Sequence, residues 1–234
     1  MGIDRMSLKK IHTRLIYNIW RRLLVRYGTL EKNPVVLDCG SGPGRLLGLM
    51  QEWFPQTTLY GLDIDYTVIS EARQATRGTN YLVASAEMLP FPEKAVDILV
   101  TLHMVEHLAE PEHFFREANR VLRPEGILAL ATPNPQSIGA RIMKDKWSGW
   151  CPEHVSLKPP ETWERLLTKH GFSVLQHGTT GLSGLPLCRK TPLGLINWGA
   201  LWLFGFFPWR QGEAYICVAR KNAMKAKSYN SVNP

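Results

Sequence analysis

The hydrophobic positions of this chain repeat with two different periods along its length. Short, mostly apolar runs predict seven strands, at 34–39, 58–63, 80–84, 95–101, 126–132, 172–178 and 213–220. Helical spacing, with Pro or Gly at several boundaries, predicts helices between them, at 44–54, 66–76, 111–123 and 160–170. Strands that alternate with helices in this way are typical of an α/β protein with a parallel sheet.

A further amphipathic helix is predicted ahead of the first strand, at 8–27. Its apolar positions fall near one face at helical spacing: Leu8, Ile11, Leu15, Ile19, Leu23 and Tyr27. Arg and Lys occupy positions between them, so the helix should have one apolar and one basic face.

Two long segments interrupt the alternation, and such connections are usually functional or disordered. Residues 133–159 have little periodicity and carry two Trp and one His, so they are interpreted as a lid or substrate loop. Residues 179–212 contain nineteen uncharged residues, 191–209, which reach the length of a membrane span. A single crossing would separate strand 213–220 from its sheet. Three interpretations remain: a cap over the substrate, a patch in the membrane interface, or a helix packed on the domain or across a dimer.

Composition is that of an ordinary globular protein. The 234 residues suffice for one well-cored α/β domain, and 44% hydrophobic with 21% charged residues is usual for a soluble protein. The four cysteines are far apart without any C-x-x-C pair, which argues against a zinc ribbon or disulfide framework and favours a reducing cytoplasm. Charges interrupt the first residues, so no secretory signal is predicted.

The net charge of +8 is concentrated at the two ends of the chain. Residues 1–30 hold seven Lys and Arg against one Asp, and residues 220–234 hold four Lys and Arg. Basic ends favour contact with an anionic surface, either lipid headgroups or a nucleic acid. The alternative is a solvated basic helix together with a disordered tail at 221–234.

The decapeptide VVLDCGSGPG, at 35–44, indicates the chemistry most directly. An apolar strand leads into three glycines spaced two apart, Gly40, Gly42 and Gly44, and then into a helix. Such a turn lets the backbone approach a ligand where any Cβ would clash, which indicates a site for a nucleotide-like cofactor. The dinucleotide fingerprint G-x-G-x-x-G is excluded because Arg45 stands at its sixth place.

The D-x-G-x-G-x-G run instead resembles motif I of the class I S-adenosylmethionine-dependent methyltransferases. The runs SAEMLPFPEKAVDILVTLHMVEHL and FREANRVLRPEGILALATPN resemble later motifs, and the likeness covers about 34–178. It is nearest to the O-methyltransferases of ubiquinone biosynthesis and their small-molecule relatives. The resemblance implies a Rossmann-like fold: a seven-stranded, mostly parallel sheet with helices on both faces and an antiparallel closing strand. It also implies S-adenosylmethionine as cofactor and S-adenosylhomocysteine as product.

The same resemblance implies the cofactor contacts, which are Asp38, Gly40, Gly42, Gly44, Asp63, Ile64, Ser85, Ala86, Glu87, Leu102 and His103. Asp63 ends the second strand, where its carboxylate can accept hydrogen bonds from both ribose hydroxyls. Asp65 fits the N-cap of the next helix better. Ser85 stands where the family commonly has Asp, which shifts adenine recognition toward the backbone of Ala86 and toward Glu87.

Methyl transfer from a sulfonium is an in-line displacement, so the protein contributes mostly positioning and electrostatics. A base is needed only when the acceptor carries a proton. The candidate catalytic residues are His154, His107 and Glu106, since His accepts protons near neutral pH. A loop His bonded to backbone remains the alternative for His107, and an outward lid residue for His154.

Residues 103–107 spell H-x-x-E-H, a pattern found in some zinc proteases. Its place after a strand of a nucleotide-type sheet argues against proteolysis. In the ubiquinone-related enzymes the corresponding E-x-x-E-H is implicated in binding a divalent metal. His103 replaces the first Glu here, which disfavours magnesium and leaves a borderline metal as an alternative. No metal ligand is therefore assigned.

The sequence thus predicts a cytoplasmic methyltransferase of class EC 2.1.1 that acts on a small or lipid-like acceptor, at oxygen, with His-assisted deprotonation. Residues 1–30 should cap the cofactor pocket of a domain at 31–220, and peripheral membrane contact is expected from the apolar segment. RNA methylation and a non-catalytic cofactor-binding scaffold are the alternatives. No nucleic-acid partner is expected, because no basic stripe with interleaved aromatics crosses the centre. The oligomeric state stays open.

Overall fold

The computed structural model describes residues 17–28, 33–182, 196–197, 199–201, 203 and 206–223. A seven-stranded sheet in the order β3-β2-β1-β4-β5-β7-β6 forms its centre. The strands are β1 (Val35–Cys39), β2 (Thr58–Asp63), β3 (Asn80–Val83), β4 (Val96–Leu102), β5 (Leu122–Pro133), β6 (Phe172–Thr179) and β7 (Ala214–Lys221). Only β7 runs against its neighbours, pairing antiparallel with β5 and β6. The predicted mostly parallel sheet with an antiparallel closing strand is confirmed.

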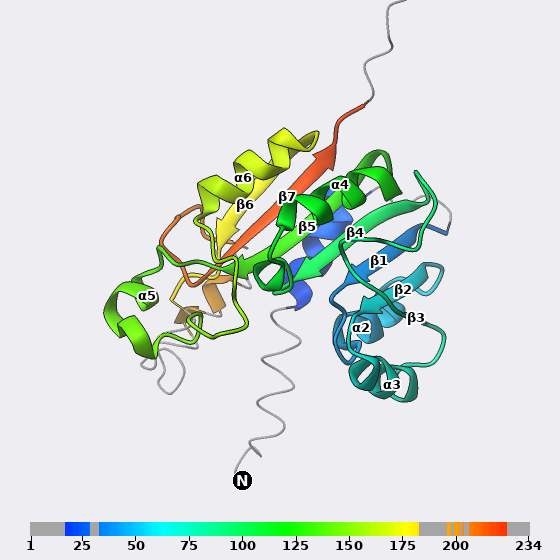
Figure 1. The fold of residues 1–234 in the computed structure, drawn as a ribbon, viewed down its shortest axis with the longest axis horizontal. Helices are drawn as coiled ribbons and strands as arrows, with labels where there is room; N and C mark the ends of the chain where they lie inside the picture. The colour runs from blue at the N-terminus through cyan, green and yellow to red at the C-terminus, as the bar shows by residue number, and fades with distance from the viewer. Residues whose placement is uncertain are drawn as a thin grey trace, which may run out of the picture.

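Helices cover both faces of the sheet (Figure 1). They are α2 (Arg45–Trp53), α3 (Tyr66–Ala75), α4 (Pro111–Val121), α5 (Ile138–Met143) and α6 (Pro160–Lys169), with 3-10 turns η1 (Val105–His107) and η2 (Lys144–Lys146). The helix at 17–27, α2 and α3 pack on one face, while α4 and α6 pack on the other. Successive strand residues alternate between these two cores, as pleating requires: Ile98 and Val100 of β4 face the first and Leu99 faces the second.

One predicted boundary was wrong. The helix expected at 111–123 ends at Val121, and β5 begins at Leu122, four residues before the predicted strand. Pro124 explains the early end, because a residue that precedes proline is disfavoured in the α conformation. The chain then turns at Glu125, whose φ of 64° is left-handed.

The N-terminal helix is a structural element of the domain from residue 17 to residue 27. Ile19 and Leu23 are buried as predicted, and Trp20 and Leu24 are buried beside them. The apolar stripe is therefore wider than the predicted spacing indicated. The hydroxyl of Tyr27 donates to Oε1 of Gln176 on β6, at 2.9 Å. The predicted positions Leu8, Ile11 and Leu15 lie outside the described residues.

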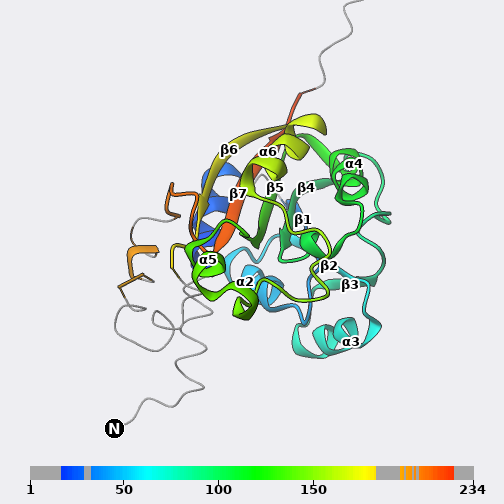
Figure 2. The same cartoon turned by 60° about the vertical axis from the view of Figure 1, so that its left-hand side comes forward.

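The segment 133–159 contains α5 and η2, which its weak periodicity did not reveal. Figures 1 and 2 show α5 beyond the carboxyl ends of β4 and β5. Ser137 caps α5 by accepting a hydrogen bond from the amide of Ala140, at 2.9 Å. Asn134, which is fully buried, donates to the carbonyls of Arg210 and Gly212, at 2.7 and 2.8 Å. These bonds fasten the start of the segment to the chain that leads into β7.

Within the ranges that the structure describes, no helix has the length and apolar content needed to cross a bilayer. Much of the predicted apolar stretch 191–209 lies outside those ranges. Of its described residues, Leu201 is fully buried and Phe206 nearly so, and the ring of Phe206 lies 5.9 Å from that of Trp20. These two side chains belong to the domain core.

Candidate functional site

The three glycines after β1 form a loop that only glycine can build with ease. All three have left-handed φ angles: 77° at Gly40, 52° at Gly42 and 73° at Gly44. A Cβ on Gly40 would lie 2.5 Å from Cγ of Met104, and one on Gly44 would lie 2.0 Å from the hydroxyl of Tyr81. At Gly42 no described atom lies within 4 Å of that position, so the loop backbone is open to a ligand there.

Asp63 links this glycine loop to the end of β2. Its Oδ2 accepts a hydrogen bond from the amide of Gly42, at 3.0 Å, and its Oδ1 accepts one from the amide of Asp65, at 3.1 Å. The side chain of Asp65 accepts bonds from the amides of Thr67 and Val68, so its predicted N-cap role is confirmed. The carboxylate of Asp63 therefore lies at the sheet edge where a ribose was predicted to bind.

Asp38, at the base of the loop, is only 3% exposed. Burial, and then the negative charge of Asp63, raise the pKa of its carboxyl to about 7. Tyr17 lies close enough to Asp38 for its phenol to be affected by that charge. Burial, and then the negative charge of Asp38, raise the pKa of the Tyr17 phenol. A residue of the N-terminal helix thus adjoins the glycine loop, in the region that the helix was predicted to cap.

The predicted adenine contacts lie beside Asp63. Ile64 is 75% exposed, and the amide of Ala84 donates to the carbonyl of Asp63 at 3.0 Å, which brings the following loop alongside. In that loop the hydroxyl of Ser85 accepts a bond from the amide of Glu87, at 3.1 Å. The Ser85 hydroxyl thus stabilises its own turn.

The chain after β4 connects the glycine loop to a second group of residues. His103 follows Leu102 with a φ of 56°, which is uncommon for a residue other than glycine and is often found at functional sites. Glu106 is fully buried, and neither of its carboxylate oxygens has a hydrogen-bond partner among the described residues. Nδ1 of His103 lies 3.4 Å from Oε1 of Glu106, but the pair does not form a hydrogen bond.

His107 and His154 face each other, with ring centroids 4.7 Å apart and an interplanar angle of 76°. Nδ1 of His107 lies 3.0 Å from the carbonyl oxygen of Glu153, and Nδ1 of His154 lies 2.8 Å from that of Gly149. Because a carbonyl oxygen only accepts, each Nδ1 must carry a proton. In a neutral ring, Nε2 then has the lone pair. The backbone bond expected as the alternative for His107 is therefore present, and it leaves Nε2 available.

The structure brings the three predicted catalytic residues together. One potential ligand atom from each of Glu106, His107 and His154 lies within 4.8 Å of the others. Two imidazoles and a carboxylate form a set that suits a borderline divalent cation such as zinc, and the same set suits general base catalysis. The sequence placed His103 rather than His154 in the metal pattern, because His154 is distant along the chain.

A cavity of about 290 Å³ opens beside this group. Its lining residues are His103, Glu106, Pro133, Trp147, Ser148, Gly149, His154, Glu213 and Ala214. Trp147 and Glu213 were not predicted as site residues, and the indole Nε1 of Trp147 donates to the Glu213 carboxylate. No local motif marks Glu213. Its position before an antiparallel strand, however, places it at the same edge as the carboxyl ends of β4 and β5.

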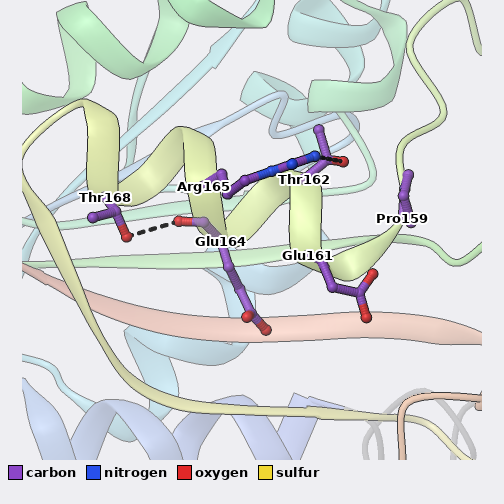
Figure 3. Close-up of a pocket in the computed structure, with 6 residues that line it drawn as sticks. All are labelled: Pro159, Glu161, Thr162, Glu164, Arg165 and Thr168. Carbon is purple, nitrogen blue, oxygen red and sulfur yellow. Dashed lines mark hydrogen bonds between the residues drawn. The ribbon is translucent and has the colours of Figure 1, made fainter.

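A wider hollow of about 620 Å³ lies along α6, lined by Pro159, Glu161, Thr162, Glu164, Arg165 and Thr168 (Figure 3). Its polar side chains already have partners: Arg165 donates to Thr162 at 3.0 Å, and Thr168 donates to the carbonyl of Glu164 at 2.9 Å. The carboxylates of Glu161 and Glu164 accept from Arg210, at 2.8 and 3.3 Å. This hollow contains none of the predicted site residues. The smaller cavity, which adjoins the sheet edge and the histidines, is the candidate acceptor site.

The sequence model of a protein family described as "Methyltransferase domain" matches residues 12–177 of this chain. The chain belongs to this methyltransferase family. The match contains the glycine loop, Asp63 and the group of Glu106, His107 and His154. The predicted methyltransferase family is therefore confirmed, and relatives of this chain are named as S-adenosylmethionine-dependent enzymes.

The methyltransferase is 33% identical over 123 residues to a Mycobacterium tuberculosis protein named "Probable S-adenosylmethionine-dependent methyltransferase". That match covers 51% of this chain and 44% of the relative, less than half of the relative's length. It is also 26% identical over 194 residues to a ubiquinone/menaquinone biosynthesis C-methyltransferase of Erwinia tasmaniensis, covering 71% of this chain and 77% of that protein.

Among solved structures, an S-adenosylmethionine-dependent methyltransferase from Archaeoglobus fulgidus superposes with a TM-score of 0.62 at 22% identity. The superposition covers 93% of this chain and 100% of that chain. At this identity the likeness supports the Rossmann-like fold alone, so the acceptor has to be argued from the site itself.

Proposed function

We propose that this methyltransferase transfers the methyl group of S-adenosylmethionine to a hydroxyl oxygen of a small or lipid-like acceptor, with His154 as general base. The main support is the packing of the Met104 side chain against Gly40, so close that it leaves no room for a Cβ there, which puts the glycine loop beside the segment that carries His103 and Glu106. A cofactor on the loop and an acceptor in the cavity would meet at one sheet edge, the usual ligand site of such sheets.

The residues around the glycine loop fit the cofactor. The open backbone at Gly42 can accept the methionine portion, Asp63 can accept bonds from the ribose hydroxyls, and the exposed Ile64 can cover one face of the adenine. Bound there, S-adenosylmethionine supplies an activated methyl group. The remaining task of the protein is to orient the acceptor and to receive its proton.

His154 has the geometry for that second task. The Gly149 carbonyl fixes its tautomer, so Nε2 can take the acceptor's hydroxyl proton. With S-adenosylmethionine held at the glycine loop and Asp63, the acceptor oxygen would then take the methyl group from the sulfonium, and the sulfur would leave as the thioether of S-adenosylhomocysteine. The positive charge now on His154 lies close to the Glu106 carboxylate, which stabilises it. His107 holds the His154 ring by edge-to-face contact.

The His154→Asn variant tests this assignment. The cell's small-molecule extract, incubated with methyl-labelled cofactor, identifies a methylated product by mass spectrometry. We expect His154→Asn to lower the turnover of that acceptor by about 10²–10⁴-fold, while cofactor affinity in calorimetry stays unchanged. His177→Asn is the matched control, since His177 is a half-exposed residue of β6 paired with Glu164. Turnover of His154→Asn equal to that of the control would contradict the role of His154.

The product also tests the acceptor atom. One of the relatives is named as a C-methyltransferase. A methyl carbon bonded to oxygen resonates at lower field in the carbon NMR spectrum than one bonded to carbon. A methyl group on carbon would refute O-methylation while leaving the cofactor site intact.

A further inference from the structure

The polar lining of the acceptor cavity is acidic. It contains two carboxylates, Glu106 and Glu213, and no Lys or Arg among the lining residues that the structure describes. Each of its two histidines has Nδ1 directed at another group of the protein. Nδ1–H of His154 is engaged by a backbone carbonyl, and Nδ1 of His103 faces the Glu106 carboxylate at 3.4 Å.

Glu106 requires a hydrogen-bond donor that the described protein does not supply. It is fully buried, and both oxygens are without a hydrogen-bond partner in the described part of the chain. An unpaired buried acceptor is costly, and in native structures such an atom usually indicates a ligand, an ion or a functional role. Because Glu106 lines the cavity, a bound molecule with an O–H or N–H group can supply the donor.

Glu213 is fixed in place from several sides. Its carboxylate accepts from the indole of Trp147, and a Cβ at Gly139 would lie 2.3 Å from its Oε2. Its backbone donates to the carbonyl of Gly181 at 2.8 Å and accepts from the amide of Asn134 at 3.0 Å. The Glu213 carboxylate is thus held in place between α5 and the chain before β7.

We propose that this cavity selects its acceptor by charge: it takes an uncharged or cationic acceptor that offers an O–H or N–H donor, and it rejects carboxylates and phosphates. The inference rests on the proposed function, since it treats this cavity as the acceptor site. A carboxylate in the cavity would offer Glu106 a second acceptor instead of a donor. Like charges brought together at a site of this kind weaken binding, and they give specificity through repulsion.

Two probes of nearly equal size separate charge from shape: 4-hydroxybenzamide and 4-hydroxybenzoate. Their binding to the protein saturated with S-adenosylhomocysteine is measured by NMR titration, with EDTA present to keep metal ions off the histidines. We expect the amide to bind at least about tenfold more tightly than the carboxylate. Glu106→Gln and Glu213→Gln should each reduce that preference, since each removes one charge at constant size. Glu71→Gln, on the exposed face of α3, is the control and should preserve it.

Three outcomes would overturn charge selection. The carboxylate could bind as tightly as the amide or more tightly, or neither probe could bind. The preference for the amide could also stay unchanged in both Glu variants. Methyl transfer is tested separately, in samples that contain labelled S-adenosylmethionine and no added S-adenosylhomocysteine. Transfer to an anionic acceptor would refute the selection while leaving the proposed function intact. A preference for the amide that disappears in the variants, with no transfer to any acceptor, would refute the function but not the selection.

Discussion

Two carboxylates on the cofactor side of the site differ in burial and therefore in chemistry. Asp63 is half-buried and each of its oxygens accepts one backbone amide, which leaves each able to accept a second donor, whereas Asp38 is buried and carries a raised pKa. The sequence identified both from their places at strand ends. It could not reveal their difference, because the burial of Asp38 depends on the strands that pair with β1 on both sides, β2 and β4, and these come from later parts of the chain.

The pH dependence of stability should report the state of Asp38. Its pKa in the folded protein, about 7, lies above the ordinary value of 3.8 for an aspartate, so the folded state binds this proton more tightly. The carboxyl therefore favours folding when protonated, and this contribution is lost as the pH rises from about 4 to about 7. We expect the unfolding free energy of the cofactor-free protein, measured in urea, to fall over that range relative to Asp38→Asn. Parallel pH profiles for the two proteins would show that Asp38 has an ordinary pKa.

Asp63 acts between elements, because it joins the end of β2 to the loop that precedes α2. Asp63→Ala removes the predicted ribose contact and the partner of the Gly42 amide. We expect it to weaken cofactor binding in calorimetry by about 1.5–3 kcal/mol. Asp65→Ala is the matched control: it removes the cap of α3, so it should lower the unfolding free energy by about 1 kcal/mol and leave affinity unchanged. Equal cofactor affinities in the two variants would refute the ribose assignment.

Helices and strands were predicted well where the hydrophobic pattern of the sequence was strongly periodic. The strands and helices of the sheet layers appear close to their predicted bounds, since alternation and helical spacing record which face is buried. α5 was missed because six residues give too short a pattern. The cavity was missed for a different reason: Trp147 and Glu213 are far apart in sequence and are brought together only by the antiparallel return of β7.

For the whole molecule, the open question was how the apolar stretch 191–209 is used. Leu201 and Phe206 belong to the core, which supports the packed-helix interpretation for these residues. Ile196 and Leu203 are 67% and 57% exposed, so part of the stretch can still contact lipid. Deleting the whole stretch would damage the core, and point substitutions are therefore the better test of membrane contact.

We predict that the protein binds vesicles containing phosphatidylglycerol and that this binding weakens with salt, because the basic ends of the chain attract anionic headgroups. Ile196→Ser combined with Leu203→Ser should reduce co-sedimentation at high salt, where insertion of apolar side chains is the remaining attraction. Val83→Ser is the control, since Val83 is 44% exposed on the edge strand β3, outside this stretch. If the protein bound neutral phosphatidylcholine vesicles as well as anionic ones, electrostatic attraction would be excluded as a cause of membrane binding. Unchanged sedimentation of the double variant would show that these side chains do not insert, and the lipid-like acceptor would then lose its structural support.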